Sequence, residues 1–196
     1  MNKVLNVGGN SKEIAIASQY DGWQQDLLDI DASQNPDILA DARELTEQQA
    51  EIYDAVYCSH NLEHYYLHDA KKVLIGFRHV LKPDGHAYIT VPDLKQVMAQ
   101  VVNENLDITD VLYQSQMGPI HVYDVLYGHQ GKIECSGEEF FAHKIGFTPT
   151  SLRQILLDAG FPVVANSVSP LNVSAIAFMR QPTEAQCDLF GIVYEK

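Results

Sequence analysis

Short apolar runs separated by polar and turn residues recur along most of the chain. Runs of this length, bounded by turn residues, are typical of buried β-strands. The last two runs lie close together, which predicts an antiparallel hairpin at the edge of a sheet. The predicted strands cover residues 4–7, 26–30, 55–58, 87–91, 162–169 and 174–179.

Helical spacing of apolar residues appears between several of these runs. Residues 62–81 carry apolar side chains three and four positions apart, and the pattern stops at the K-P-D-G stretch of residues 82–85, a stop and turn signal. A second helix is predicted over residues 150–159, with Thr150 or Ser151 as its cap and a glycine directly after its end.

Strands that alternate with helices predict an α/β fold with a mostly parallel sheet, helices on both faces and an antiparallel edge strand. A chain of 196 residues is most simply one domain, so we expect residues 1–196 to form a single unit. Residues 94–147 are the least regular part and are rich in Tyr, Gly and His. Because connections this long are usually functional, we interpret residues 94–147 as a substrate lid, called the lid segment below.

Glycines and carboxylates follow the predicted strands, at the edge of an open α/β sheet where ligands bind. Gly8 and Gly9 follow the first strand, and without side chains they let a ligand approach the backbone. Asp29 ends the second strand, 21 residues after Gly8, a spacing at which a carboxylate accepts hydrogen bonds from a ribose. The other polar residues at strand ends are Asp31, Asp41, Ser59, His60, Asn61 and Asp93.

Each of these residues also has a purely structural explanation. A Gly-Gly pair is often only a tight turn, and Asp29 or Asp31 alone is more often a cap or a solvated residue. Asp41 could start a helix over residues 42–49, where a carboxylate suits the positive end of the helix dipole. Their joint order, each at the end of its own strand, is the stronger signal and favours a ligand site.

Charge and composition limit the partners. A formal net charge of −13 would repel phosphate backbones and anionic membranes, so we expect no nucleic acid and no membrane as partners; the charge says nothing about a small-molecule substrate. We find no run of about 18 apolar residues and no signal-peptide pattern, and we therefore expect a cytoplasmic protein. The three cysteines are scattered, which argues against a disulfide framework and a zinc ribbon. The oligomeric state stays open, with a homodimer among the states considered.

One succession of motifs spans about residues 3–180: LNVGGN, LLDID, PDILADA, YDAVYCSHNLEH, VLKPDGHAYITVPD and GFTPTSLRQILLDAGF. It resembles the class I S-adenosylmethionine-dependent methyltransferases, and it looks closest to their small bacterial type 11-like branch. The CSHNLEH and LKPDG stretches are its most specific parts. The resemblance implies a Rossmann-like fold, S-adenosylmethionine (SAM) as the cofactor and methyl transfer to a small-molecule acceptor.

The resemblance also implies roles for single residues. Gly8 and Gly9 would face the methionine part of the cofactor, Asp29 would bind the ribose, and Asp41 would face the adenine amino group. The backbone of Ala42 would lie beside the adenine ring. The implied cofactor-binding residues are Gly8, Gly9, Asp29, Ile30, Asp41, Ala42, Ser59 and His60.

Three histidines at intervals of four residues raise the question of a metal site. His60, His64 and His68 would share one face of a helix, as the ligands of H-E-x-x-H sites do. Glu63 does not follow the first histidine as it does in that motif. We therefore predict no metal site, and we interpret His64 and His68 as surface or packing residues.

Methyl transfer needs a general base only where an O–H or N–H acceptor must lose its proton, a role that suits histidine at pH 7. We favour His60, at a strand end, and His143, just before the GFTPTSLRQILLDAGF stretch, as the catalytic residues. An ordinary surface or core histidine is the alternative for each. The full set of candidates is His60, His121, His129 and His143.

Two other functions were weighed. A dinucleotide site is disfavoured because Asn10 and Glu13 replace the later glycines of G-x-G-x-x-G, and no Tyr-x-x-x-Lys proton donor occurs in the chain. A non-catalytic module with a degenerate methyltransferase fold stays open. It is favoured by Asn10, where the family typically has glycine, and by the weak helical periodicity of residues 11–25.

Overall fold

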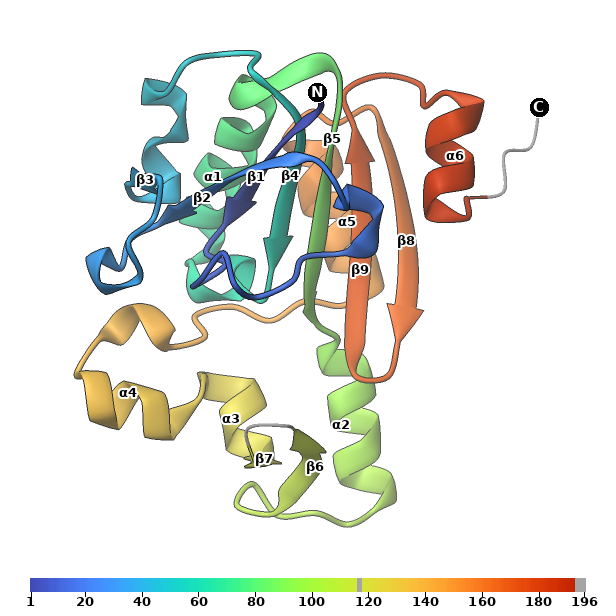
Figure 1. Ribbon diagram of the computed structural model, residues 1–196. Helices are drawn as coiled ribbons and strands as arrows, with labels where there is room; N and C mark the ends of the chain where they lie inside the picture. The colour runs from blue at the N-terminus through green and yellow to red at the C-terminus, as the bar shows by residue number, and fades with distance from the viewer. Residues whose placement is uncertain (116–117, 193–196) are drawn as a thin grey trace.

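The computed structural model describes residues 1–115 and 118–192 (Figure 1). Two residues of the lid segment (116–117) and the last four residues of the expected 1–196 unit (193–196) lie outside the described residues. Among the described helices, none combines the length and the apolar character needed to cross a bilayer.

A seven-stranded sheet in the order β3-β2-β1-β4-β5-β9-β8 forms the centre of the molecule (Figure 1). Its parallel pairs join β3 to β2, β2 to β1, β1 to β4 and β4 to β5, whereas β9 runs antiparallel to both β5 and β8. The predicted α/β fold, with its mostly parallel sheet and antiparallel hairpin at the edge, is confirmed. The strands are β1 (Lys3–Val7), β2 (Gln24–Asp29), β3 (Ile38–Leu39), β4 (Tyr53–Ser59), β5 (Leu81–Pro92), β8 (Val163–Ser169) and β9 (Asn172–Phe178).

The first predicted helix is wrong at its beginning. Residues 62–64 form a separate 3-10 turn, η4 (Leu62–His64), and the helix α1 runs only from Leu67 to Val80. Tyr65 and Tyr66 between them have extended backbone, with ψ of 147° and 156°. His60, His64 and His68 therefore do not share one helix face.

The K-P-D-G stretch ends α1 as predicted, but it is not a free turn. The strand β5 begins at Leu81, directly after the helix, and residues 82–85 bulge out of the ladder opposite Asp54. Lys82 Nζ lies 2.8 Å from Asp54 Oδ2 and fixes the bulge to β4. A turn signal within a strand of this length thus produces a bulge, which keeps β4 and β5 paired beyond it.

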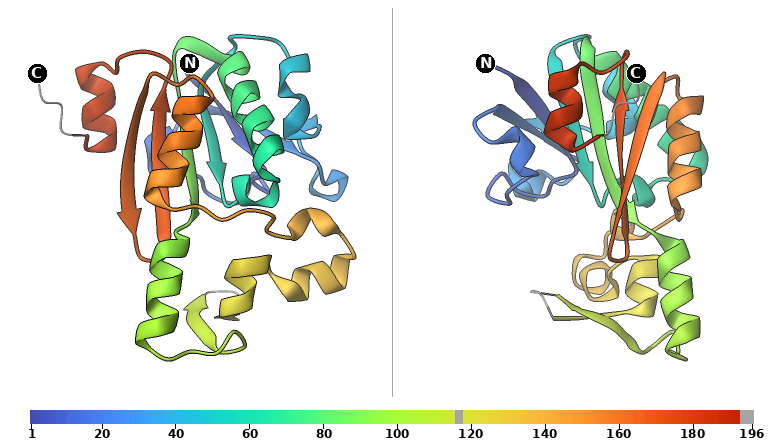
Figure 2. Two further views of the ribbon diagram at one scale, coloured as in Figure 1. Left: turned by 180° about the vertical axis from the view of Figure 1, so that it is seen from behind. Right: turned by 90° about the vertical axis from the view of Figure 1, so that its right-hand side faces the viewer.

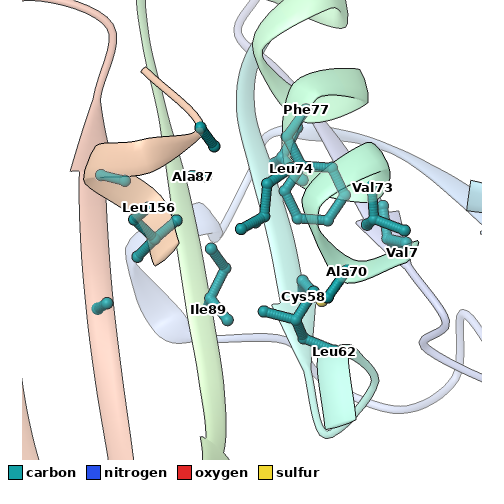
Figure 3. Close-up of a cluster of buried hydrophobic side chains, with 14 of the residues drawn as sticks. Val7, Cys58, Leu62, Ala70, Val73, Leu74, Phe77, Ala87, Ile89 and Leu156 are labelled. Atoms are coloured by element: carbon teal, nitrogen blue, oxygen red, sulfur yellow. The ribbon is translucent and has the colours of Figure 1, made fainter. Parts of the chain in front are cut away.

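The helices α1 and α5 (Pro149–Asp158) cover one face of the sheet. Apolar residues of α1, such as Leu74 and Phe77, pack onto Val7, Cys58 and Ile89 of the central strands (Figure 3). A 3-10 turn, η3 (Ala42–Glu47), packs beside α1. The opposite face carries shorter elements, η1 (Ser18–Tyr20) and α6 (Glu184–Phe190) (Figure 2). Aromatic side chains cluster beneath them. Within residues 11–25, where the helical periodicity of the sequence is weak, the helical element is the 3-10 turn η1.

The lid segment lies beyond the carboxyl ends of the parallel strands (Figure 1) and is more regular than the sequence predicts. A small apolar cluster of Val97, Leu112, Val122 and Val125 holds it together. Its two ends meet where Leu94 N–H donates to Phe147 O at 2.9 Å. Its elements are α2 (Leu94–Asn103), β6 (Val111–Ser115), β7 (Gly118–His121), α3 (Val122–Tyr127), α4 (Gln130–Ser136) and η5 (Glu139–Phe141).

Candidate functional site

A cavity of about 480 Å³ opens between the carboxyl ends of the parallel strands and the lid segment. Residues from three parts of the chain form its walls: the strand ends, the stretch around η4 and α1, and the far end of the lid segment. The cavity is lined by Gly8, Asn10, Asp29, Ile30, Asp31, Asp41, Arg43, His60, Asn61, His64, Tyr65, Tyr66, His68, Asp69, Lys132, Phe140, Phe141 and Lys144.

Asp29 is buried at the floor of this cavity and organises the chain around it. Its Oδ2 accepts a hydrogen bond from the backbone N–H of Asn10 at 3.1 Å, and its Oδ1 accepts one from the N–H of Asp31 at 3.0 Å. Asn10 adopts φ +62°, a conformation that asparagine tolerates better than most residues. Asn10 therefore makes the left-handed turn after Gly9 without a further glycine.

Asp41 is held by a cation that the sequence analysis did not consider. Arg43 Nε donates to Asp41 Oδ2 at 2.9 Å, and the backbone N–H of Arg43 donates to Oδ1 at 2.9 Å. Burial alone would raise the pKa of the Asp41 carboxyl, but the hydrogen bonds and charge of Arg43 outweigh it and lower that pKa. Asp41 thus both starts η3, as its structural explanation predicts, and faces the cavity as an ionised carboxylate.

The predicted cofactor-binding residues divide into two groups. Gly8, Asp29, Ile30, Asp41 and His60 line the large cavity. The other three, Gly9, Ala42 and Ser59, are not part of its lining, and Ala42, the first residue of η3, is buried.

The lid segment contributes cavity residues that sequence reasoning missed. Phe140 and Phe141 lie in η5, and Lys132 Nζ lies over the Phe141 ring, 3.9 Å from its centroid. Burial lowers the pKa of Lys132, an effect that Asp29 and Asp31 oppose. The neighbouring aromatic pair in the sequence FFAHKIGFT was the available signal, since paired aromatic residues in a polar loop suit a planar ligand.

A second cavity of about 140 Å³ adjoins the first, and His60 lines both. The His60 side chain is 51% exposed, its backbone adopts φ +51°, and its backbone N–H donates to Thr90 O at 2.8 Å. His143, the other predicted catalytic residue, lines only the smaller cavity. The structure therefore brings His60 and His143 to the same small cavity, from β4 and from the lid segment. The remaining lining residues are Pro92, Tyr113, Ile120, Asp124, Val125, His129, Leu171 and Asn172.

Glu63 lies behind the two histidines and is 1% exposed. His60 Nδ1 is 3.5 Å from Glu63 Oε1, and His143 Nε2 is 3.9 Å from the same oxygen. The ligand atoms of Glu63, His64 and His143 all lie within 4.8 Å of one another. Among residues 1–115 and 118–192, neither carboxylate oxygen of Glu63 has a hydrogen-bond partner.

The charges in this cluster are settled by burial and proximity. Burial alone would raise the pKa of the Glu63 carboxyl, but His60, His64 and His143 together hold the pKa below its usual value. Burial also lowers the pKa of His64, whereas the pKa of His60 is raised because Glu63 outweighs the effect of burial. Glu63 is therefore an ionised carboxylate inside the protein.

The part of the chain that matches a known protein family contains most of the residues that line the two cavities. The sequence model described as "Methyltransferase domain" matches residues 1–166, which include the strand-end residues, the whole lining of the large cavity, and that of the small cavity except Leu171 and Asn172. The protein is a methyltransferase with a Rossmann-like fold. The chain belongs to the methyltransferase-domain family, which confirms the family predicted from the order of its motifs. A search of curated protein sequences finds no match to the chain.

Solved structures share the fold at low sequence identity. A SAM-dependent methyltransferase from Archaeoglobus fulgidus superposes with a TM-score of 0.57 at 17% identity, over 90% of this chain and 86% of that one. A SAM-dependent methyltransferase from Methanosarcina mazei gives 0.54 at 14% identity, over 90% and 92%. PigF, in a structure with SAH, gives 0.57 at 12% identity, over 90% of this chain and 50% of PigF.

Proposed function

We propose that the protein transfers a methyl group from SAM to a small-molecule acceptor, with SAM in the large cavity and the acceptor in the small one. The observation that carries the proposal is the position of Asp29. Its buried carboxylate faces a cavity of about 480 Å³ at the end of β2, and each of its oxygens keeps a free lone pair for a ribose hydroxyl. PigF, which has the same fold, was solved with SAH.

The charges around the large cavity suit SAM. At neutral pH this cofactor carries a sulfonium, an ammonium and a carboxylate, and so has a net positive charge. The cavity lining holds four carboxylates against three side chains that are always cationic near pH 7. These are Asp29, Asp31, Asp41 and Asp69, and Arg43, Lys132 and Lys144.

The small cavity supports an acceptor of limited size. Its volume of about 140 Å³ matches a compact molecule rather than a polymer. His60 borders both cavities and is the side chain placed to contact the acceptor beside the methyl group, so we keep it as the proposed catalytic residue. His143 borders the same cavity with its Nδ1 bound to Val125 O at 2.8 Å, and we propose that it positions the acceptor.

The acceptor class agrees with the charge of the whole chain. A net charge of −13 disfavours nucleic acid and anionic membranes as substrates, so a small molecule is the proposed partner. We also propose a cytoplasmic location, and the oligomeric state stays open, with a homodimer among the states considered.

One observation favours a second candidate, a module that no longer binds SAM. The guanidinium of Arg43 donates to Asp41 Oδ2 and its backbone N–H donates to Oδ1, so Arg43 engages both oxygens of the carboxylate proposed for the adenine amino group. If Arg43 keeps Asp41, the adenine loses this partner, and the fold would serve an interaction instead. Ligand titration separates the two candidates.

The test is calorimetric titration of the protein with SAM, SAH and NAD. We expect micromolar binding of SAM and SAH and no binding of NAD. In Asp29→Asn the SAM affinity should fall by about 10-fold or more, because a charged hydrogen-bonding group is lost. Asp37→Asn is the matched control. Asp37 also accepts a backbone hydrogen bond, from the N–H of Leu27 at 2.8 Å, but it does not line the cavity. No heat from SAM and SAH, or equal losses in both variants, would contradict the proposal.

A further inference from the structure

The cluster around Glu63 brings one buried carboxylate and several imidazole rings close together. A buried carboxylate needs a partner that compensates for its lost hydration, such as a hydrogen-bond donor, an opposite charge or a bound cation. Glu63 is 1% exposed, and both of its oxygens lack a hydrogen-bond partner in the described part of the chain. Three imidazole rings surround it instead, those of His60, His64 and His143.

The orientation of two of these rings explains why they do not donate to Glu63. His64 Nδ1 lies 3.2 Å from Ala142 O, and His143 Nδ1 lies 2.8 Å from Val125 O. A carbonyl oxygen can only accept, so in the neutral rings the proton is on Nδ1 and the lone pair is on Nε2. In His143, the nitrogen that carries this lone pair, Nε2, lies 3.9 Å from Glu63 Oε1. Two electron-rich atoms face each other, and a cation between them would satisfy both.

Ligand histidines in metal sites show this same arrangement. They bind the ion through one ring nitrogen and donate the other N–H to a backbone carbonyl or a carboxylate, which fixes the tautomer. His64 and His143 both have a backbone carbonyl in that position. The two rings are also close to each other and steeply inclined, with centroids 4.8 Å apart at 73°.

We propose that Glu63, His64 and His143 form a binding site for a divalent transition-metal ion of the zinc type. Two imidazoles and one carboxylate are a donor set that Zn²⁺ takes with a fourth position open. Tetrahedral Zn²⁺ holds its ligand atoms about 3.4 Å apart, so the three ligand atoms, now within 4.8 Å of one another, would have to approach each other by up to about 1.4 Å. His60, 3.5 Å from Glu63 Oε1, lies next to the open position.

The position of this site gives it a structural consequence. Glu63 and His64 belong to η4, beside the end of β4, whereas His143 belongs to the last part of the lid segment. Lys144 N–H already donates to Glu63 O at 2.8 Å, so backbone contacts bring the two segments together. A bound ion would fasten the lid segment to the sheet between the two cavities.

The experiment uses tag-free full-length protein, freed of metal by a chelator and then titrated with Zn²⁺ alone at pH 7. We expect one ion per chain and a rise in the thermal unfolding midpoint, since the ion binds only the folded arrangement. Replacing Zn²⁺ by Co²⁺ should give the strong visible absorption of a four-coordinate site. The test contains no SAM, so its outcome is independent of the proposed methyl transfer.

Two ligand variants and one control make the assignment specific. Glu63→Gln and His143→Gln lie on different segments, and each should weaken Zn²⁺ binding by about 100-fold or more while circular dichroism shows a folded chain. Should Glu63→Gln fail to fold, His143→Gln, which is partly exposed, decides alone. His68→Ala removes the histidine that shares the four-residue spacing but lies outside the cluster, and it should bind Zn²⁺ like the wild type. Absence of binding in the wild type, unchanged binding in His143→Gln, or an equal loss in His68→Ala would overturn the proposal.

Discussion

The side chain of Asn61 occupies the space that a β-carbon on Gly8 would need. A β-carbon built there would lie 2.0 Å from Asn61 Nδ2, and Gly8 itself adopts φ +68°. The backbone N–H of Gly8 donates to Leu28 O at 2.8 Å, which holds the turn against β2. The ends of β1, β2 and β4 are thereby locked together at the floor of the large cavity, and only glycine fits at position 8.

Gly8→Ala should therefore destabilise the protein and weaken SAM binding together. The left-handed backbone costs an alanine about 1–2 kcal/mol, and the overlap with Asn61 adds about 1–3 kcal/mol. We expect a loss of about 2–5 kcal/mol in the free energy of unfolding, the sum of these two terms, measured by urea denaturation. SAM affinity, measured by calorimetry, should fall at least tenfold.

Gly22→Ala separates the two contributions. Gly22 adopts φ +79°, but no described atom lies within 4 Å of the β-carbon it would gain. Its substitution should cost only the backbone part, about 1–2 kcal/mol, and leave SAM affinity unchanged. If Gly8→Ala is no worse than Gly22→Ala, the contact with Asn61 is not a constraint on the turn.

His86 should make stability depend on pH between about 4 and 6.5. It is 3% exposed, its Nε2 is 3.0 Å from the Tyr20 hydroxyl, and burial lowers its pKa to about 4. The unfolded chain, with a histidine pKa near 6.5, binds more protons than the folded chain in this window, so stability falls as the pH falls. The contribution lost is about 3 kcal/mol by pH 4, at about 1.36 kcal/mol for each unit of the shift.

The measurement is urea denaturation at a series of pH values for the wild type and for His86→Gln. Glutamine keeps a polar side chain near Tyr20 but does not titrate. The difference in the free energy of unfolding between the two proteins should shrink as the pH falls from 6.5 to 4. A difference that stays constant across this range would show that His86 does not carry the effect.

The aromatic residues of η5 should contribute to SAM binding without supporting the fold. Phe141 lines the large cavity and stacks under Lys132, but it does not belong to the apolar clusters of the sheet or the lid segment. We expect Phe141→Ala to weaken SAM binding by about 5- to 10-fold, because a half-buried aromatic contact of about 1 kcal/mol is lost. The free energy of unfolding should change by less than about 1 kcal/mol. An unchanged SAM affinity would place the cofactor away from η5.

The sequence predicted the features that depend on local pattern. The buried strands, the hairpin of β8 and β9, and the position of Asp29 at the end of β2 follow from apolar periodicity and from the rule that ligands bind at strand ends. The break between η4 and α1 was not predictable in this way, because Leu62 and Glu63 are buried by contacts with residues far along the chain, such as Lys144.

The cluster around Glu63 was missed for the same reason. Sequence spacing grouped His60, His64 and His68, because it assumed one continuous helix. The structure instead brings His143 to Glu63 across 80 positions of sequence, through the return of the lid segment to the sheet. Long-range meetings of this kind depend on the whole fold and leave no periodic signal in either segment.

The cap of α5 shows the same limit on a smaller scale and can be tested directly. The sequence predicts Thr150 or Ser151 as the cap, but the helix begins at Pro149, and the Thr148 hydroxyl accepts the N–H of Ser151 at 3.3 Å. Thr148→Ala should therefore lower the free energy of unfolding by about 1 kcal/mol. Thr150→Ala, which changes the second residue of the helix, should lower it by less than about half as much. Urea denaturation of the two variants side by side measures this difference. A larger loss in Thr150→Ala would move the start of α5 two residues along the chain and return the cap to the place that the sequence predicted.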